Sequence, residues 1–399
     1  MITIPISHRS AATLAQGHLW IFSNEVKLTK PFPAQGTWCW FENNGTIVGT
    51  GYVNPHSLIL GRVVAMGRRD HPEEILRERL LQSFERRHAL LEHGAARLLF
   101  SEADFLPGLV VDWYSGVVLI QSNTAGIDAV LPDLERIVPE IFEKVFQRKC
   151  EGLVVRADSS IRRLEGLDSF TRVVIGDASA LTQGAFNQDG VLYAADFING
   201  QKTGFFLDQR LNRASLAEAI MKDQKKKVLD LCCYSGGWGL RALKEGAGHV
   251  TFVDESAEAL ALVEKGMTLN GFSGDRARVV KSDVFDFLES NKETYDVVVV
   301  DPPAFVKSNK IKAKALKAYE KLNRLSWRRV KEGGRLITCS CSYHVTDAEF
   351  MDVLNNAVSK EKACAHVVYR GSQANDHPVL LSMPETHYLK CVGLKKLTF

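Results

Sequence analysis

The sequence of 399 residues predicts an α/β protein, in which a parallel, doubly wound C-terminal domain follows a small β-rich unit and a central α+β domain. From about residue 203, strands alternate with helices over roughly 190 residues, the pattern of a doubly wound sheet. Two of these strands, at residues 228–231 and 297–301, are nearly continuous apolar runs, as in strands buried on both faces. Earlier in the chain the strands and helices do not alternate regularly, which favours an α+β arrangement there.

Residues 1–70 form the first predicted unit. Alternation predicts strands at Thr37–Phe41 and Thr46–Val53, and Asn44-Gly45 between them is a strong signal for a tight hairpin. A third strand is expected at Leu58–Ala65. The unit is therefore mainly β-structure.

Residues 71–198 form the predicted central domain. A helix is expected from His71 to His93, because proline and acidic residues open it and apolar residues recur at helical spacing. A hairpin follows around Ser115-Gly116, and Val130–Phe146 is an amphipathic helix. Further strands are expected at Leu153–Ala157, Arg172–Gly176 and Val191–Phe197.

Residues 199–399 form the predicted doubly wound domain. A helix at Gln209–Met221 leads into its first strand. The expected strands, separated by helices except at the end, lie within 226–233, 249–256, 276–283, 295–303, 334–342, 365–370 and 387–397.

The composition is that of an ordinary globular protein, with 45% hydrophobic and 24% charged residues and a net charge of +3. No stretch approaches the ~20 apolar residues of a membrane helix, and the N-terminus lacks the features of a secretory signal. Eight cysteines are too sparse for a disulfide scaffold, so we expect reduced thiols, a cytoplasmic location and no membrane partner. No cluster of His and Cys predicts a metal site.

Acidic residues end consecutive strands of the doubly wound domain, where ligands bind in open α/β sheets. Asp230 precedes a turn of small residues that ends in GGWG, and Asp254, Asp283 and Asp301 end the next three strands. A dinucleotide site would show GxGxxG instead, so this set favours S-adenosylmethionine, a cationic adenosine without phosphates. Carboxylates that merely cap helices are the alternative, and we consider it the weaker one. Within the turn, the expected ligand contacts are Tyr234, Ser235 and Gly236.

The segment Asp301-Pro302-Pro303-Ala304-Phe305 lies where the methyl group should be transferred, and we expect Pro302, Pro303, Phe305 and Lys307 to contact the substrate. Similar segments serve enzymes that methylate exocyclic amines, so this run alone leaves the target open. The next strand end contains Cys339 and Cys341. A pyrimidine C5 becomes nucleophilic enough to accept a methyl group only after a thiolate adds to C6. Alternation puts both cysteines on one face, and Cys341, nearer the carboxyl end, is our candidate nucleophile, with Asp301 holding the base.

Several segments, together spanning nearly the full chain, resemble a bacterial family of class I methyltransferases. This family carries an N-terminal PUA domain, a small β-barrel, and makes 5-methylcytosine in large-subunit (23S) ribosomal RNA. Gly17–Val26 resembles its PUA opening motif, and Asn199–Arg213 is the most specific stretch. The resemblance implies S-adenosylmethionine as cofactor, with Asp254 and Asp283 at ribose and adenine, and Cys341 as nucleophile. It also implies cofactor contacts by Phe206, Arg210 and Asn270.

Two departures from related patterns stand out. Cys232 and Tyr234 replace glycines of the generic methyltransferase loop. Ala304 stands where another group of RNA cytosine methyltransferases has a second cysteine, which leaves the base for the C5 proton open between His344 and an acid.

Cations follow the DPPAF segment and suit an RNA partner as well as a solvated helix face. Arg86-Arg87 and Arg162-Arg163 in the central region are further candidates for RNA contact, and a homodimer is left open. Two other functions are considered: methylation of guanine or an exocyclic amine without a covalent step, and a non-catalytic RNA-binding assembly factor. The lysines that follow the DPPAF segment are Lys307, Lys310, Lys312, Lys314, Lys317 and Lys321.

Overall fold

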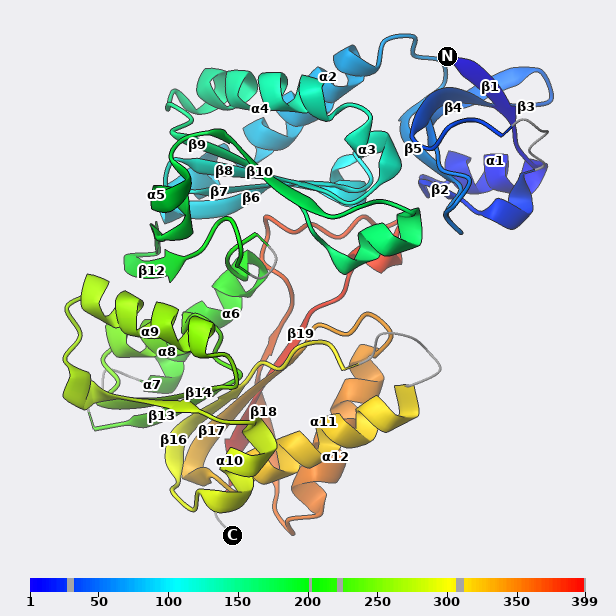
Figure 1. Cartoon of the computed structure of the whole chain (residues 1–399). Helices are drawn as coiled ribbons and strands as arrows, with labels where there is room; N and C mark the ends of the chain where they lie inside the picture. The colour runs from blue at the N-terminus through cyan, green and yellow to red at the C-terminus, as the bar shows by residue number, and fades with distance from the viewer. Residues whose placement is uncertain (27–31, 201–202, 221–224, 306–311, 398–399) are drawn as a thin grey trace. The chain divides into compact units, whose positions relative to one another are not determined.

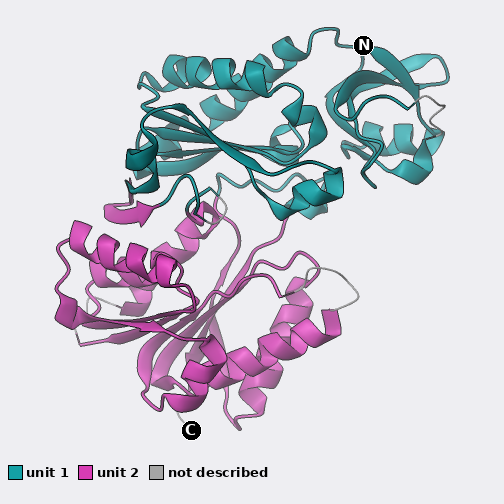
Figure 2. Cartoon of the chain, in the orientation of Figure 1, with its two compact units in different colours: residues 1–184, 196–204, 375–386 teal, residues 185–195, 205–374, 387–399 magenta. Residues whose placement is uncertain are grey.

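The structure is a computed structural model that describes residues 1–26, 32–200, 203–220, 225–305 and 312–397 (Figure 1). The chain divides into two compact units (Figure 2). Unit 1 comprises residues 1–184, 196–204 and 375–386, and unit 2 comprises residues 185–195, 205–374 and 387–399. Three segments thus group differently from the predicted domain boundaries, because 185–195 joins unit 2, whereas 199–204 and 375–386 join unit 1.

The N-terminal part of unit 1 is a five-stranded sheet in the order β1-β3-β4-β5-β2. Asn44 and Gly45 both have positive φ, at 52° and 81°, which is the backbone of the predicted tight hairpin between β3 and β4. A helix, α1 (His8–Ala15), was not expected from the sequence; the Ser7 side chain caps it. The strands are β1 (Ile2–Pro5), β2 (Trp20–Ile21), β3 (Thr37–Asn43), β4 (Thr46–Val53) and β5 (Gly61–Met66).

A second five-stranded sheet in unit 1 has the order β10-β9-β8-β7-β6, and α2 (Pro72–Arg86) and α4 (Leu131–Phe146) cover one of its faces (Figure 1). The core between these layers includes Leu80, Phe84 and Phe142, all fully buried. The strands are β6 (Ala95–Phe100), β7 (Leu109–Tyr114), β8 (Val117–Ser122), β9 (Gly152–Ala157) and β10 (Phe170–Ile175), of which β6 was not predicted.

The predicted helix from His71 to His93 is interrupted at Arg87. Helix α2 ends at Arg86, and residues His88–His93 form a 3₁₀ helix. The Arg87 guanidinium is buried and forms a bidentate pair with Asp104 at 2.7 and 3.1 Å. We attribute the break to this long-range pair, which local helical spacing does not reveal.

A buried ion pair links the two sheets of unit 1. Arg62, on β5, contacts the carboxylate of Glu165 at 2.7 Å, with side-chain exposures of 7% and 3%. Asn54 and Ser57 donate further hydrogen bonds to the same carboxylate, at 2.9 and 2.7 Å. Such a pair is stable only because its remaining lone pairs are also satisfied.

Unit 2 contains a seven-stranded sheet in the order β15-β14-β13-β16-β17-β19-β18. Strands β13 to β17 run parallel, as the sequence predicts. Helices α8 (Gly237–Lys244) and α9 (Ala257–Leu269) lie on one face, and α10 (Val284–Ser290), α11 (Lys312–Trp327) and α12 (Asp347–Ser359) lie on the other (Figure 1). The strands are β13 (Lys227–Leu231), β14 (His249–Asp254), β15 (Ala277–Lys281), β16 (Tyr295–Val300), β17 (Val330–Ser340), β18 (Ala365–Gly371) and β19 (Lys390–Lys396).

As expected, no α-helix separates the last two strands of the doubly wound domain within the described residues. A short 3₁₀ helix, Pro384–Thr386, lies between β18 and β19, and β19 is antiparallel to both of its neighbours. The expected helix at Gln209–Met221 consists of shorter pieces: a 3₁₀ turn at Leu207–Gln209, α6 (Arg210–Ala214) and α7 (Leu216–Ile220). A small separate ladder pairs β11 (Gly184–Gln188) with β12 (Val191–Ala195). Among the described helices, none combines the length and the apolar character that crossing a bilayer requires.

The Arg62–Glu165 pair provides a test of the fold of unit 1. Glu165→Ala should destabilise the protein by about 3–5 kcal/mol, because it leaves Arg62 buried without its counter-ion. Urea unfolding followed by circular dichroism measures the change. Glu140→Ala is the matched control, since Glu140 pairs with Arg77 on the surface and its loss should change stability little. Equal effects of the two variants would contradict this account of Glu165.

Candidate active site

The turn after β13 has a strained backbone. Cys232 and Tyr234 adopt left-handed conformations, with φ of 57° and 47°, and Gly236 has φ of 79°. The two non-glycine residues therefore keep the backbone that glycine favours at the positions where the generic methyltransferase loop has glycine. Strain of this kind persists where the surrounding structure enforces it, which is common at ligand sites.

Close packing holds the helix that follows this turn against the sheet. A Cβ atom on Gly239 would lie 2.1 Å from Cε1 of Phe252 on β14, so only glycine fits. The Gly239 N–H also donates to the Asp230 carboxylate at 2.8 Å. Helix α8 thus begins directly over the end of β13, where the turn can face a ligand.

Asp230 is fully buried at the end of β13, and its Oδ1 has no hydrogen-bond partner among the described residues. Burial raises the pKa of Asp230 to about 8, although the bond from Gly239 acts in the opposite direction. A cationic group placed beside the turn would favour the ionised carboxylate. Ser235 is also buried, and its hydroxyl likewise has no described partner.

The carboxylates at the next two strand ends have different local partners. Asp254 accepts hydrogen bonds from the backbone N–H groups of Tyr234 at 2.8 Å and Ser256 at 3.0 Å. Asp283 is exposed and caps α10 through bonds from Phe285 and Asp286. The capping alternative thus describes Asp283 in part, whereas Asp254 ties the first turn to the second strand.

The residues expected at the cofactor from the family resemblance lie in unit 2. Phe206 is half-buried, and its ring meets that of Tyr234 edge-on at 5.4 Å between centroids. Arg210 is buried, with its guanidinium 3.8 Å from the Asp189 carboxylate. Asn270 instead uses its amide to bond the backbone of Leu192, at 2.6 and 2.9 Å. The structure shows this structural role for Asn270, and its contact with the cofactor stays a prediction.

Asp301 follows β16, and neutral donors hold its carboxylate. Nε2 of Gln209 lies 3.0 Å from both carboxylate oxygens, and Nε1 of Trp238 lies 2.9 Å from Oδ2. Neither Gln209 nor Trp238 was predicted as a site residue from the sequence. Both lie inside stretches already singled out in the sequence, Asn199–Arg213 and the GGWG turn, and this position was the only signal available.

The structure distinguishes between the two cysteines near the end of β17, Cys339 and Cys341. Cys339 is fully buried and contacts Cys391 on β19, and desolvation raises the pKa of its thiol well above the usual value. Cys341 lies beyond the end of the strand and is half-buried. Burial also raises the pKa of Cys232 and Cys233, so these thiols are poor candidates for a nucleophile.

A buried lysine lies near Cys341. Lys390 Nζ donates to the backbone carbonyls of Ser342 and Tyr388, each at 2.8 Å. Burial lowers the pKa of Lys390, and the nearby Asp347 and Cys341 oppose that shift. A cation in this position favours the thiolate form of a neighbouring cysteine.

The residues expected to contact the substrate follow Asp301. Pro302 is buried and Pro303 is exposed. The ring of Phe305 packs against that of Tyr319, with 4.6 Å between the ring centroids. Lys307 lies outside the described residues. His344 is half-buried beside Tyr343, at 5.4 Å between ring centroids.

Two predicted RNA contacts are wrong. Arg87 is buried in its pair with Asp104, and Arg162 is buried in a bidentate pair with Asp128 at 2.8 and 2.9 Å. A basic dipeptide in a sequence does not show whether a distant carboxylate will bury one of its members. Arg163 is exposed, and Arg86 is half-exposed and paired with Asp104.

The lysines of the DPPAF region also divide into groups. Lys307 and Lys310 lie outside the described residues. Lys312 pairs with Glu349 at 2.7 Å and Lys321 with Glu289 at 2.8 Å. Lys314 and Lys317 are exposed on α11 and pair with no residue that the structure describes.

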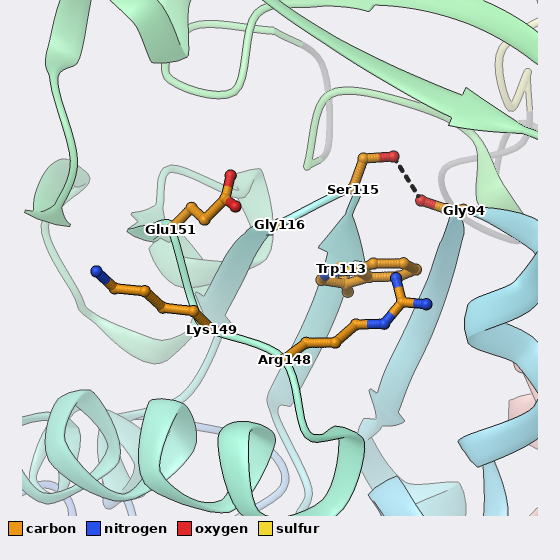
Figure 3. A pocket seen from close by; sticks show the side chains of 7 residues that line it. All are labelled: Gly94, Trp113, Ser115, Gly116, Arg148, Lys149 and Glu151. Carbon is orange, nitrogen blue, oxygen red and sulfur yellow. Dashed lines mark hydrogen bonds between the residues drawn. The ribbon is translucent and has the colours of Figure 1, made fainter.

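Unit 1 has a separate cavity of about 460 Å³ at the turn between β7 and β8 (Figure 3). The Arg148 guanidinium lies over the Trp113 ring at 5.8 Å, and Lys149 lies beside it along the chain. These groups suit a planar or anionic group. None of the site residues expected from the sequence lines this cavity.

The residues around the first turn of unit 2 fit S-adenosylmethionine. A buried carboxylate oxygen on Asp230 lacks a partner among the described residues, which suits a nearby cationic group. Asp254 ends the next strand, where a carboxylate can accept the hydroxyls of a ribose. Within the part of the chain that the structure describes, no group of three or more potential metal ligands is found.

Comparisons with known proteins agree with this geometry. A family model described as S-adenosylmethionine-dependent methyltransferase matches residues 97–389, and one described as PUA-like domain matches residues 4–65. Proteins named ribosomal RNA large subunit methyltransferase I from Shewanella amazonensis and Pseudoalteromonas translucida are each 32% identical to this chain. The alignments cover 98% of both chains for the first and 95% of both for the second.

The fold has close structural neighbours. A candidate methyltransferase solved with S-adenosylhomocysteine matches with a TM-score of 0.81 at 21% identity, covering 99% of this chain and 100% of that one. A candidate SAM-dependent methyltransferase from Streptococcus mutans gives a TM-score of 0.80 at the same identity and coverage. These likenesses concern the fold alone.

Gly239 provides a test of the turn as a ligand site. Gly239→Ala should lower the Tm and weaken S-adenosylmethionine binding, because the added methyl must push α8 away from Phe252 at a cost of about 1–3 kcal/mol. Calorimetry measures both quantities. Gly274→Ala is the control, since its Cβ would meet no atom within 4 Å. A Gly239→Ala protein that binds the cofactor like the wild type would argue against the assigned position of the turn.

Proposed function

The chain belongs to the S-adenosylmethionine-dependent methyltransferases, and from that premise we propose that it methylates C5 of a cytosine in large-subunit ribosomal RNA. The names of the two curated relatives and the full-length similarity support the RNA substrate. The PUA-like match at residues 4–65 agrees with it. The side chains at the ends of β16 and β17 support the choice of the target atom.

One observation carries the choice of cytosine C5. Asp301 and Cys341 follow the ends of the neighbouring parallel strands β16 and β17. The Asp301 carboxylate accepts a hydrogen bond from Gln209, and the Cys341 thiol is half-buried. In the register of the two strands Val300 lies opposite Thr338, so both groups extend from the same edge of the sheet. A carboxylate that holds the N3/N4 edge beside a thiolate that attacks C6 is the arrangement that C5 methylation requires.

The proposed reaction proceeds through a covalent adduct on the base. The Cys341 thiolate forms a bond to C6, and the electron pair of the C5–C6 bond becomes available at C5. When bound, S-adenosylmethionine supplies an electrophilic methyl group, to which C5 bonds as the methyl leaves sulfur. A base then takes the C5 proton, a role left open between His344 and an acid. The electron pair of the broken C5–H bond restores the C5–C6 double bond, and the C6–S bond breaks to release the Cys341 thiolate for another cycle.

The environment of the cysteines supports Cys341 as the nucleophile. Cys339 is fully buried with its pKa raised by desolvation, whereas Cys341 is half-buried and lies near the Lys390 ammonium. Because the thiolate is the reactive form, the cysteine near a cation is the better nucleophile. The target base must also be extruded or unpaired for this thiolate to reach C6.

Cys341→Ala tests the covalent route. We expect product formation to fall by about 10³-fold or more, since the uncatalysed C5 has almost no nucleophilicity. Mass spectrometry of nucleosides from ribosomal RNA incubated with protein and labelled methyl donor measures the product. Cys339→Ala should retain the activity. RNA that contains 5-fluorocytosine should form a stable adduct with the wild type and with Cys339→Ala, but not with Cys341→Ala.

The other enzyme function predicts a different result. Methylation of guanine or of an exocyclic amine would continue in Cys341→Ala and would leave no trapped adduct. Undiminished turnover in that variant would therefore rule out the covalent route while keeping the methyltransferase.

The two exposed lysines of α11, Lys314 and Lys317, provide a test of RNA contact. The double variant Lys314→Ala/Lys317→Ala should raise KM for RNA and reduce the slope of log affinity against log salt by about 1.5, the value for two lost phosphate contacts. Filter binding over a range of salt concentrations measures this. Lys312→Ala/Lys321→Ala removes the same charge from lysines that are already paired, so its effect should be smaller. If both double variants weaken binding equally, net charge alone accounts for the effect.

A further inference from the structure

The donor that holds Asp301 is itself held by a second layer of hydrogen bonds. Oε1 of Gln209 accepts from Nδ2 of Asn212 at 2.7 Å, and Nδ2 also donates to the Ser372 carbonyl at 3.0 Å. Oδ1 of Asn212 accepts from the Tyr369 hydroxyl at 2.9 Å. A relay of hydrogen bonds therefore leads from Tyr369 on β18 through Asn212 and Gln209 to Asp301.

The chemistry of its ends fixes the direction of this relay. A backbone carbonyl only accepts, so the amino group of Asn212 must face Ser372. That same amino group meets Gln209, which therefore presents its oxygen to Asn212 and its own amino group to Asp301. Gln209 is consequently a fixed donor toward the carboxylate of Asp301.

The two amide side chains of the relay are buried. Gln209 and Asn212 are buried, with exposures of 2% and 0%. At Gly371, on the strand that contains Tyr369, a Cβ atom would lie 2.1 Å from Oδ1 of Asn212 and 2.6 Å from the Tyr369 hydroxyl oxygen. Because Gly371 has no side chain, Oδ1 of Asn212 and the Tyr369 hydroxyl can occupy this space and bond each other.

We propose that Gln209, locked by Asn212 and Tyr369, is a positioning residue that keeps Asp301 a hydrogen-bond acceptor and so makes the base pocket select cytosine over uracil. This inference rests on the proposed function, because it takes Asp301 as the group that holds the edge of the base. Gln209 acts on the substrate only through Asp301.

The preference follows from the edges of the two bases. Cytosine presents an N4 amino group, which donates to a carboxylate, whereas uracil presents the acceptor O4 at that position. Donors on the protein side stabilise the ionised, accepting form of Asp301. A protonated Asp301 would donate instead, and that would suit O4 of uracil. The relay disfavours this second form by directing the amino group of Gln209 at the carboxylate.

Gln209→Glu tests the proposal with almost no change of shape. The introduced carboxyl group would place an acceptor against Asp301, so the two carboxyls should share a proton and one of them becomes a donor. We expect the ratio of affinities for cytidine over uridine oligonucleotides to fall by about tenfold or more. Calorimetry in the presence of S-adenosylhomocysteine measures this ratio, and affinity for that cofactor product should stay within about twofold of the wild type.

Two further variants keep the test decisive. Tyr369→Phe removes only the outermost donor and should lower the same ratio by about twofold to tenfold, the range for one hydrogen bond. It provides the readout should Gln209→Glu not fold. Gln147→Glu adds the same charge at an exposed helix end in unit 1 and should leave the ratio unchanged.

The outcomes separate the two proposals. A wild type without a preference for cytidine, or variants at Gln209 and Tyr369 that keep the wild-type ratio, would overturn the relay. A wild type that prefers cytidine but forms no 5-methylcytosine on ribosomal RNA would contradict the proposed function alone. If the variants lose affinity for S-adenosylhomocysteine in parallel with their preference for cytidine over uridine, the effect is merely structural. That result would also overturn the relay.

Discussion

The parallel pairing of β13 with β14 on one side and β16 on the other is the constraint on which the site depends. Leu231, the last residue of β13, lies opposite both Val253 and Val300. The residues that follow each strand therefore meet at one edge of the sheet, although they are up to about 70 residues apart in the chain. Because the strands themselves are buried on both faces, chemistry is confined to these first residues beyond their ends.

Carboxylates in the two units are stabilised in different ways. In unit 1, Glu165 and Asp104 each pair with a buried arginine, and these pairs hold the structure together. In unit 2, the described partners of Asp301 include a neutral amide donor and a neutral indole donor. Neutral donors stabilise the ionised carboxylate of Asp301, whereas in unit 1 bidentate arginines bind the carboxylate oxygens directly.

Local patterns predicted most elements of unit 2, because long apolar runs and helical spacing are local properties of the chain. Predictions were less accurate where a distant partner decides the outcome. Arg87 follows the last residue of a helix and pairs with Asp104, and Arg162 is buried against Asp128. The missed Gln209 belongs to the same class, since a glutamine in a short helical segment shows no sign of the carboxylate it will meet.

The sequence by itself determined the kind of fold and the residue types at the carboxyl ends of the strands, because periodicity and strand ends are properties of consecutive residues. Only the tertiary structure decided which of two cysteines is buried, which arginines are structural, and which donors hold Asp301. The physical reason is that burial and hydrogen-bond partnership depend on residues brought together by folding. A thiol on β17 is buried or accessible according to what β19 covers, and the sequence around it is the same in either case.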